Sequence, residues 1–344
     1  MDKIKNLKDV GELKIDKDRK IFSANQEEIL NAYTTDIYFV RSMDILHHMG
    51  MADRVVTAEI FPRKSGVFVG VEEVFNILKD KDVGIWALPE GKTFEAKDTV
   101  MRIIGPYSEF AVFETIILGI LASSTGWATA ARECRDACGD KPFIIFGSRH
   151  VHPSVAPVME RAAVIGGASG ASNILAAKTL GMEPSGTLPH ASFLIAGDTL
   201  PVALAYDEIS PKEHKRIVLI DTFKDEVEEA VRIAKALGDN LYAIRLDTPS
   251  ERGGVTPILV KEVRAQLDIE GYDFVKILVS GGLYPEKIKQ LRDAGADSFG
   301  IGSYISSASA IDMTMDLKEI EGKPVAKRGR IPGIVENPNL VRLK

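Results

Sequence analysis

The chain has 344 residues and a net charge of −6, with 49 acidic against 43 basic side chains. This length and the even mix of apolar and charged residues are typical of a globular protein of about two domains. The acidic balance argues against a nucleic-acid-binding or membrane-surface protein, because both need a basic surface to offset phosphates.

The N-terminal segment and the cysteines indicate a cytoplasmic protein. Residues 1–20 are charged throughout and lack the apolar run of a secretory signal, and no apolar run along the chain is expected to reach membrane-spanning length. Cys134 and Cys138 are four positions apart in a predicted helix, which matches neither a C-x-x-C redox motif nor a four-cysteine zinc site. We therefore expect both thiols to be reduced and structural.

The first third of the sequence predicts an α+β domain at residues 1–125. Residues 55–70 and 85–104 have the alternation and turn residues of strands. Residues 107–134 are long, apolar and periodic enough for one or two buried helices. We expect the tail 316–344 to join this domain, with one more strand over 323–332.

From residue 141 onward, short β-rich runs alternate with helical stretches, which predicts repeated β-α units with parallel strands. Six strands are expected within 143–148, 186–195, 217–222, 241–248, 275–282 and 298–303. A seventh near 166–169 stays open, and a helix is expected to end at Gly238. Because the runs end in polar residues or glycine, we predict an α/β barrel, closed or incomplete, at residues 126–315.

Glycines in the last two β-α units predict a phosphate site. Gly281 and Gly282 follow one expected strand, and Gly300 and Gly302 lie at the end of the next. Glycine lets the backbone approach a ligand closely, and the loops after the last two strands of a barrel are a recurrent phosphate site. Each motif alone would indicate only a tight turn, but two in this order favour phosphate.

Charged residues at other strand ends can complete such a site. Arg245 and Asp247 are two positions apart and therefore share a face of their expected strand. The arginine offers a cation for an anionic group, and the carboxylate can accept hydrogen bonds from ribose hydroxyls. Asp221 adds a second carboxylate at the same level. The alternative, in which these side chains pair with helices, stays open.

The ordered combination of eight motifs resembles the nicotinate phosphoribosyltransferases, particularly their archaeal form. The motifs are TTDIYF (34–39), PRKSGVFVG (62–70), FGSRH (146–150), GASNILAA (170–177), GTLPHASF (186–193), IRLDT (244–248), VSGG (279–282) and DSFGIGS (297–303). The resemblance implies the type II phosphoribosyltransferase architecture, an N-terminal α+β domain with an incomplete α/β barrel. It also implies transfer of the 5-phosphoribosyl group from phosphoribosyl pyrophosphate to nicotinate, giving nicotinate mononucleotide and pyrophosphate in NAD biosynthesis.

The resemblance assigns roles to the residues of the barrel. The four glycines would cradle the 5-phosphate, Asp247 would hold the ribose hydroxyls, and Asp221 would support the sugar or the ring. The pyridine ring would stack between Phe146 and Tyr38. Arg149 and Arg245 would meet its carboxylate.

The resemblance also implies a homo-oligomer with active sites shared between subunits. Asp36 and Tyr38 of the N-terminal domain would reach the barrel of a neighbour. Arg63 and Lys64 would meet the pyrophosphate from the same side. Magnesium would accompany the pyrophosphate, held mainly by substrate oxygens and water.

His190 matches the histidine that this family can phosphorylate with ATP, and coupling to ATP stays open. The chain lacks the four-cysteine C-terminal knuckle of some archaeal relatives, so no zinc is expected. Where many relatives have two arginines, this chain has Arg149 and His150, and the segment after Asp247 also differs.

The stretch FGSRHVHPS first suggests a metal site, because His150 and His152 would share one face of a strand. No third ligand is evident near them in sequence. We therefore interpret the stretch as one wall of an anion pocket, in which Phe146 stacks on the ring, Arg149 meets its charge, His150 assists and His152 is structural.

Three other functions stay open. A quinolinate phosphoribosyltransferase, which releases carbon dioxide, has the same two-domain architecture, although the basic pattern that holds two carboxylates is not evident here. A nicotinamide enzyme can carry both arginines. A nucleotide or phosphate sensor without catalysis would keep the phosphate site alone.

Overall fold

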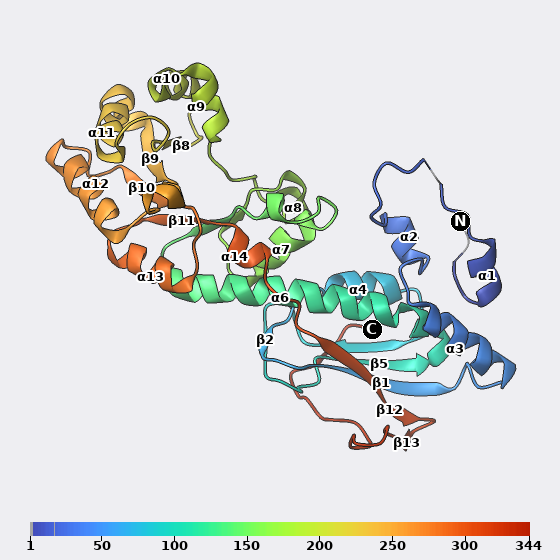
Figure 1. Cartoon of the computed structure of the whole chain (residues 1–344). Helices are drawn as coiled ribbons and strands as arrows, with labels where there is room; N and C mark the ends of the chain where they lie inside the picture. The colour runs from blue at the N-terminus through green and yellow to red at the C-terminus, as the bar shows by residue number, and fades with distance from the viewer. Residues whose placement is uncertain (1–2, 17) are drawn as a thin grey trace. The chain divides into compact units, whose positions relative to one another are not determined.

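A computed structural model describes residues 3–16 and 18–344 of the chain (Figure 1). The chain divides into two compact units: unit 1 comprises Met1–Thr129 and Ser309–Lys344, and unit 2 comprises Ala130–Ala308. The sequence predicts these boundaries at residues 125 and 315.

Unit 1 contains a six-stranded antiparallel sheet in the order β13-β12-β1-β5-β3-β14. Its strands are β1 (Val55–Pro62), β3 (Gly84–Ala87), β5 (Met101–Pro106), β12 (Met313–Ile320), β13 (Lys323–Pro324) and β14 (Val341–Arg342). A separate pair is formed by β2 (Gly66–Val67) and β4 (Thr93–Phe94). The expected strands within 55–70 and 85–104 are therefore confirmed. The expected strand over 323–332 is wrong beyond Pro324, which has no N–H with which to continue a ladder.

The helices of unit 1 cover its sheet with apolar side chains. They are α1 (Leu7–Glu12), α2 (Gln26–Leu30), α3 (Ile37–His48), α4 (Val71–Leu78), α5 (Tyr107–Phe110), η1 (Ala111–Phe113) and α6 (Glu114–Cys138), within which the boundary between the units falls. Val74 and Leu78 of α4, Ile117 and Leu121 of α6, and Ile103 of β5 belong to one buried core. Each such side chain stabilises the fold by about 1.5–3 kcal/mol.

The helical stretch Tyr107–Cys138 is long and apolar enough to cross a membrane by length and composition. The expectation that no run reaches this length is therefore wrong. More than half of its most apolar window is buried inside the protein, as in the core helix of a globular protein. Cys134 and Cys138 are buried and unpaired on α6, and burial raises the pKa of Cys138 to about 11.

Unit 2 contains a sheet of six parallel strands in the order β7-β6-β11-β10-β9-β8. They are β6 (Phe143–Ile145), β7 (Gly170–Ala171), β8 (Arg216–Leu219), β9 (Leu241–Leu246), β10 (Lys276–Val279) and β11 (Ser298–Ile301). Because β7 and β8 are the two edges and do not pair with each other, the sheet is an incomplete barrel, as predicted. The open seventh strand is β7.

Helices follow the strands of unit 2. The longer ones are α7 (Ala156–Gly166), α8 (Ile174–Thr179), α9 (His190–Ala196), α10 (Thr199–Ile209), α11 (Glu226–Leu237), α12 (Pro257–Ile269) and α13 (Pro285–Asp293). Short ones are η2 (Ser148–His150), η3 (Gly238–Asn240), η4 (Ser250–Arg252) and α14 (Ser303–Ser306). Figure 1 shows α11, α12 and α13 beside one another along the outside of the sheet.

Two local expectations in unit 2 have opposite outcomes. Helix α11 ends at Leu237 and is followed by Gly238 with a φ of +54°, so the predicted helix end is confirmed. The strand expected over 186–195 is wrong, because α9 begins after the extended Pro189. Its apolar run packs only Phe193 into the core and leaves Leu194 and Ile195 exposed.

Candidate active site

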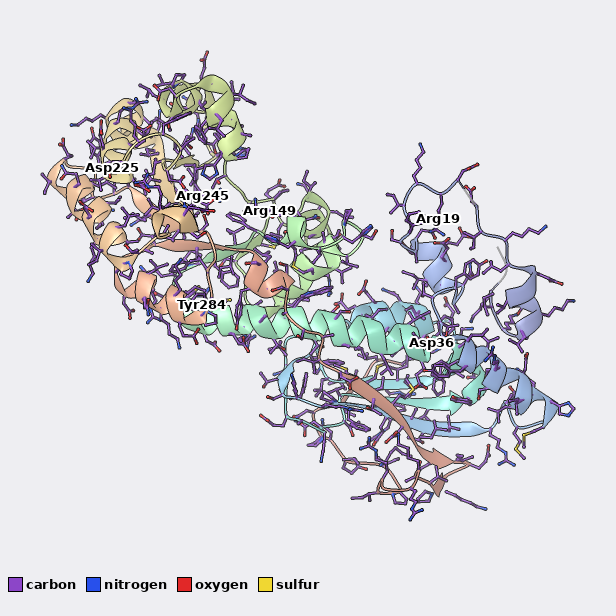
Figure 2. The ribbon with its side chains drawn as sticks, viewed as in Figure 1. Arg19, Asp36, Arg149, Asp225, Arg245 and Tyr284 are labelled. Carbon is purple, nitrogen blue, oxygen red and sulfur yellow. The ribbon has the colours of Figure 1, made fainter. Side chains whose placement is uncertain are left out.

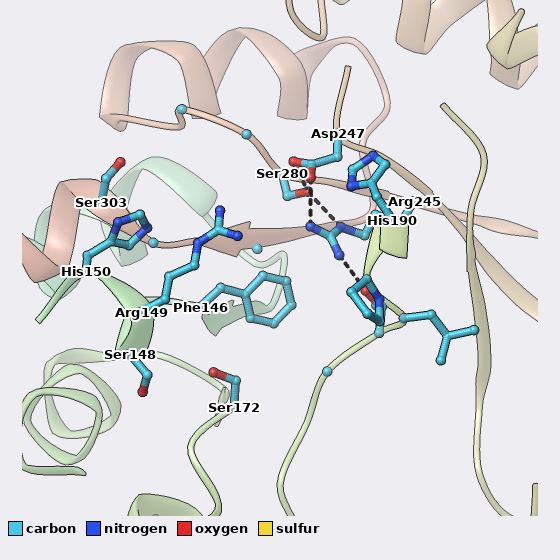
Figure 3. Close-up of a pocket in the computed structure, with 18 of the residues that line it drawn as sticks. Phe146, Ser148, Arg149, His150, Ser172, His190, Arg245, Asp247, Ser280 and Ser303 are labelled. Carbon is cyan, nitrogen blue, oxygen red and sulfur yellow. Dashed lines mark hydrogen bonds and ion pairs between the residues drawn. The ribbon is translucent and has the colours of Figure 1, made fainter. Parts of the chain in front are cut away.

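A cavity of about 700 Å³ lies at the carboxyl ends of the parallel strands of unit 2 (Figure 3). Ten residues predicted from the sequence line it: Phe146, Arg149, His150, His190, Arg245, Asp247, Gly281, Gly282, Gly300 and Gly302. Figure 3 shows Phe146, Arg149 and His150 toward one side of the cavity, and His190, Arg245 and Asp247 toward the other. The structure therefore brings most of the predicted barrel residues into one pocket.

Arg245 and Asp247 form the most extensively bonded part of this pocket, at the end of β9. Arg245 Nη2 lies 3.0 Å from Asp247 Oδ2, Nε donates to Ser280 Oγ at 2.9 Å, and Nη1 donates to Thr187 Oγ1 at 2.6 Å. Ser280 Oγ in turn donates to Asp247 Oδ1 at 2.8 Å. Three of the five guanidinium N–H groups are thus bonded to the protein, which leaves two for a ligand.

The charge of this pair is largely withdrawn from water. The side chains of Arg245 and Asp247 are 15% and 19% exposed. Burial lowers the pKa of Arg245, and the carboxylates of Asp247 and Asp221 oppose that shift. The guanidinium stays protonated, so the pair is a fixed dipole inside the cavity.

Phe146 lies close to both Arg245 and β11. The guanidinium carbon of Arg245 lies 5.5 Å from the centre of the Phe146 ring, within the range of a cation–π contact. A Cβ atom on Gly300 of β11 would lie only 2.3 Å from Phe146 Cε2. Glycine is therefore required at position 300 by the ring itself, and its role toward phosphate stays a prediction.

Gly281 and Gly282 turn the chain between β10 and α13. Their φ angles of +89° and +58° lie in the left-handed region. A Cβ on Gly281 would also lie 3.0 Å from Asp247 Oδ1. This backbone lies against the Asp247 carboxylate and lines the cavity, where a side chain would block close approach of a ligand.

The segment after β6 is not the strand end that the sequence predicts. Residues 148–150 form the short helix η2, so His150 and His152 do not share a strand face. Arg149 is exposed to the cavity, and no residue of the described ranges bonds its guanidinium. His152 Nδ1 accepts the N–H of Ser154 at 3.2 Å, a local turn contact. Within the part of the chain that the structure describes, no group of three or more His, Cys, Asp or Glu could hold a metal.

His190 is the first residue of α9, at the edge of the cavity. Its Nε2 lies 3.2 Å from Asp221 Oδ1, and the Asp221 side chain is fully buried while that of His190 is 40% exposed. The second oxygen, Asp221 Oδ2, is buried without a hydrogen-bond partner among the described residues. Burial raises the pKa of Asp221, and the charge of Asp247 raises it further. Among the described residues, no carboxylate pairs with the other imidazole nitrogen, Nδ1.

Four other predicted residues belong to unit 1. Asp36 precedes α3 (Figure 2) and accepts a hydrogen bond from the Thr115 hydroxyl at 2.8 Å. Tyr38 on α3 is 57% exposed. Arg63 pairs with Asp312 at 3.0 Å, and Lys64 is exposed. The lining of the cavity comes from unit 2 alone. The shared site that these four residues would complete stays a prediction.

The sequence interpretation missed the neutral and buried polar residues of the site. Thr187 and Ser280 hold Arg245, and Ser148 and Ser172 line the cavity. Glu160 lies behind the last two and is fully buried. The one available signal was Glu160 itself, a lone acid among the apolar residues of APVMERAAVIG.

The chain matches two family descriptions over most of its length. Residues 36–125 match the quinolinate phosphoribosyl transferase N-terminal domain, and residues 127–316 match the C-terminal domain. The nicotinate phosphoribosyltransferase pncB1 of Mycobacterium tuberculosis is 32% identical over 248 residues, 70% of this chain and 54% of that protein. The nicotinate phosphoribosyltransferase of Bacillus subtilis is 28% identical over 80% of this chain and 63% of its own length. The chain thus spans about half to two thirds of these relatives.

Solved structures agree with these matches. The nicotinate-nucleotide pyrophosphorylase from Pyrococcus furiosus superimposes with a TM-score of 0.88 at 43% identity, over 92% of this chain and 82% of that one. Human nicotinic acid phosphoribosyltransferase, with a TM-score of 0.65 at 18% identity over 87% and 77%, shows the fold alone. The chain therefore belongs to the quinolinate phosphoribosyl transferase family and has the type II phosphoribosyltransferase fold.

Proposed function

We propose that this protein transfers the 5-phosphoribosyl group of phosphoribosyl pyrophosphate to the ring nitrogen of nicotinate, a step of NAD biosynthesis. The bond from ribose C1 to the pyrophosphate oxygen breaks, and its electron pair leaves with pyrophosphate. The ring nitrogen supplies the pair for the new C1–N bond. The observation that carries the proposal is one cavity that holds the bonded Arg245–Asp247 pair, the glycine turn 281–282 and the free guanidinium of Arg149.

The chemistry asks the protein to position anions around a carbon that becomes positively charged. Fixed carboxylates and N–H groups stabilise such a centre without a side-chain nucleophile. In the proposal, the turn at Gly281 and Gly282 binds the 5-phosphate, and the Asp247 carboxylate accepts hydrogen bonds from the ribose hydroxyls. Because Ser280 and Arg245 already hold Asp247, little reorganisation is needed when the sugar binds.

The arginines that line the cavity favour nicotinate over quinolinate. Among the described residues that line it, Arg149 and Arg245 are the two arginines, and Arg245 is engaged by Asp247, Ser280 and Thr187. Arg149 alone offers a whole guanidinium fork, which matches a single carboxylate. Quinolinate would bring a second carboxylate into the same space. The curated relatives cited above are named for nicotinate as well.

His190 is the proposed site of coupling to ATP. The γ-phosphoryl group would pass to Nδ1 while ADP leaves, and the contact of Nε2 with the buried Asp221 supports this choice of nitrogen. Mg²⁺ would enter with phosphoribosyl pyrophosphate, held by its oxygens and by water. We further propose a homo-oligomer in which Asp36, Tyr38, Arg63 and Lys64 of one subunit complete the cavity of another.

One assay tests this proposal. The protein is incubated with phosphoribosyl pyrophosphate and Mg²⁺ and with nicotinate, nicotinamide or quinolinate, each with and without ATP, and the nucleotide is detected by mass. We expect nicotinate mononucleotide from nicotinate, with a gain on adding ATP that His190→Ala loses. Carbon dioxide release from quinolinate as the main reaction would overturn the substrate assignment. Ligand binding without any pyrophosphate release would indicate a sensor.

A further inference from the structure

Glu160 is a buried carboxylate behind the cavity that the proposed transfer does not use. It lies on α7 and has no exposed surface. A buried carboxylate is expensive unless donors satisfy both of its oxygens. What Glu160 binds therefore indicates what it holds in place.

Three neutral donors from two loops converge on this carboxylate. Ser148 Oγ donates to Oε1 at 2.6 Å and Ser172 Oγ donates to the same oxygen at 2.9 Å. The backbone N–H of Asn173 donates to Oε2 at 2.7 Å, and Asn173 Nδ2 donates to Ser148 Oγ at 3.2 Å. The loops after β6 and β7 are thus joined through one side chain by charge-assisted hydrogen bonds, which are stronger than neutral ones.

This arrangement determines whether one wall of the cavity presents hydrogen-bond donors or acceptors to a ligand. Ser148 and Ser172 line the cavity, and Figure 3 shows both below Phe146 and Arg149. Each hydroxyl has a single hydrogen, and in both residues Glu160 receives it. Ser172 therefore presents lone pairs to a ligand, and these repel an anionic oxygen. On this side, the guanidinium of Arg149, which directly follows Ser148, is exposed to the cavity and can bind a negative group.

We infer that Glu160 is a positioning residue that fixes Arg149 and the orientation of the two serine hydroxyls for the anionic group of the pyridine substrate. The inference rests on the proposed function for the identity of that group. It does not depend on which pyridine acid is used. The geometry of the two loops belongs to the free protein and can be tested separately.

The key variant is Glu160→Gln, which keeps the size of the side chain but offers only one accepting atom. If the amide oxygen takes the place of Oε1, the amide nitrogen faces the N–H of Asn173, and if the amide is turned over, both serine hydroxyls lose their acceptor. In either orientation at least one of the two loops loses its bond to residue 160. We expect the KM for the pyridine acid to rise at least tenfold, while the KM for phosphoribosyl pyrophosphate stays within twofold. Ser172→Ala, which keeps the charge and removes one donor, should give a smaller rise in the same KM.

The matched control is Glu229→Gln. Glu229 is also fully buried in unit 2, on α11, and contacts Arg232 at 3.2 Å, but it does not line the cavity. We expect both KM values of this variant to stay within twofold of the parent. A loss of folding common to both variants would show as equal falls in melting temperature.

Hydrogen exchange of the free proteins gives a second readout that needs no substrate. In Glu160→Gln, peptides covering 146–152 and 170–176 should exchange at least fivefold faster, with other unit 2 peptides unchanged. The same peptides should not change in Glu229→Gln. Unchanged exchange in these loops, or faster exchange throughout unit 2 with an equal rise of both KM values, would overturn the inference.

The two proposals fail in different ways. If the parent converts quinolinate and not nicotinate, the substrate assignment fails and the KM ratio is measured with quinolinate instead. If the parent converts no pyridine, the proposed function fails and the exchange of the two loops decides the role of Glu160 alone.

Discussion

Arg149 and Arg245 line the same cavity, but they differ in how many of their N–H groups the protein has already bonded. Three protein partners hold Arg245, and no described residue bonds the guanidinium of Arg149. An arginine whose N–H groups are already bonded to the protein makes the site rigid and adds positive electrostatic potential to it. An arginine whose N–H groups are not bonded to the protein can instead bind an anion directly. Substitution should separate these two contributions.

We expect Arg149→Ala to raise the KM for nicotinate at least tenfold, a loss of about 1.4 kcal/mol in binding, with an unchanged melting temperature. Arg245→Ala should instead lower kcat strongly and destabilise the fold, because breaking a buried pair costs about 3–5 kcal/mol. Steady-state kinetics and thermal unfolding of both variants check this. Equal effects on KM and stability in the two variants would contradict the distinction.

Asp221 predicts a pH dependence of stability. Burial raises its pKa, so the folded protein keeps the proton to a higher pH than the unfolded chain does. The stabilisation is therefore present at low pH and is lost as the pH rises from the ordinary aspartate range through the raised pKa. Asparagine cannot ionise, so Asp221→Asn should lose less stability than the parent as the pH rises above the ordinary aspartate range. Urea unfolding at several pH values measures this, and parallel curves for the two proteins would argue against it.

At the level of elements, the position of β11 is constrained by its contact with Phe146, the residue that follows β6. Strand β11 pairs with β6 and β10. Its Gly300 lies against the ring of Phe146, the residue directly after β6. No shift of one strand can relieve this contact without disturbing the ladder on the other side.

Gly300→Ala should destabilise the protein by about 1–3 kcal/mol, as expected for overpacking, and reduce activity because the ring of Phe146 must move. The control is Gly119→Ala on α6, where a Cβ meets nothing within 4 Å and alanine favours the helix. Chemical denaturation and kcat/KM of the two variants provide the comparison. Wild-type stability of Gly300→Ala would show that the ring relaxes freely.

The elements that the sequence predicts well are those with a local cause. Periodicity and a terminal glycine placed α11, and alternating β-rich runs indicated the parallel strands of the half-barrel. The strand predicted over 186–195 is wrong because a short run of apolar residues is compatible with either a strand or a short helix. Here it forms a helix that leaves Leu194 and Ile195 exposed.

The parts of the site that were missed depend on contacts between distant residues. The network around Glu160 needs residues 148, 160, 172 and 173 to meet, and no spacing in the sequence specifies that. Motifs identified all of the charged residues and histidines that line the cavity among the described residues. They carried no information on which N–H and O–H groups the protein itself would occupy.

At the scale of the whole molecule, the expected partners of the cavity include a second copy of the chain. Mixing Tyr38→Ala with Asp247→Ala, each inactive alone, should restore part of the activity, because a mixed oligomer contains one site with both native residues. The assay is nicotinate mononucleotide formation after the two proteins have been dissociated and reassociated together. No recovery, with mixed oligomers demonstrated, would show that each site belongs to one subunit.

The missing pairing between β7 and β8 leaves one wall of the cavity to irregular chain. The chain that connects these two edges contributes residues 186–191 to the cavity, and residues 182–189 form neither helix nor strand. The N–H of Ser185 donates to the Ala171 carbonyl, and Arg245 Nη1 donates to the Thr187 hydroxyl. These two bonds tie this stretch to the sheet. Such a wall can open by breaking a few hydrogen bonds of about 1 kcal/mol each, without separating paired strands. We therefore expect the escape of the nucleotide product through this wall, and not only the making of the C1–N bond, to limit the rate of the cycle.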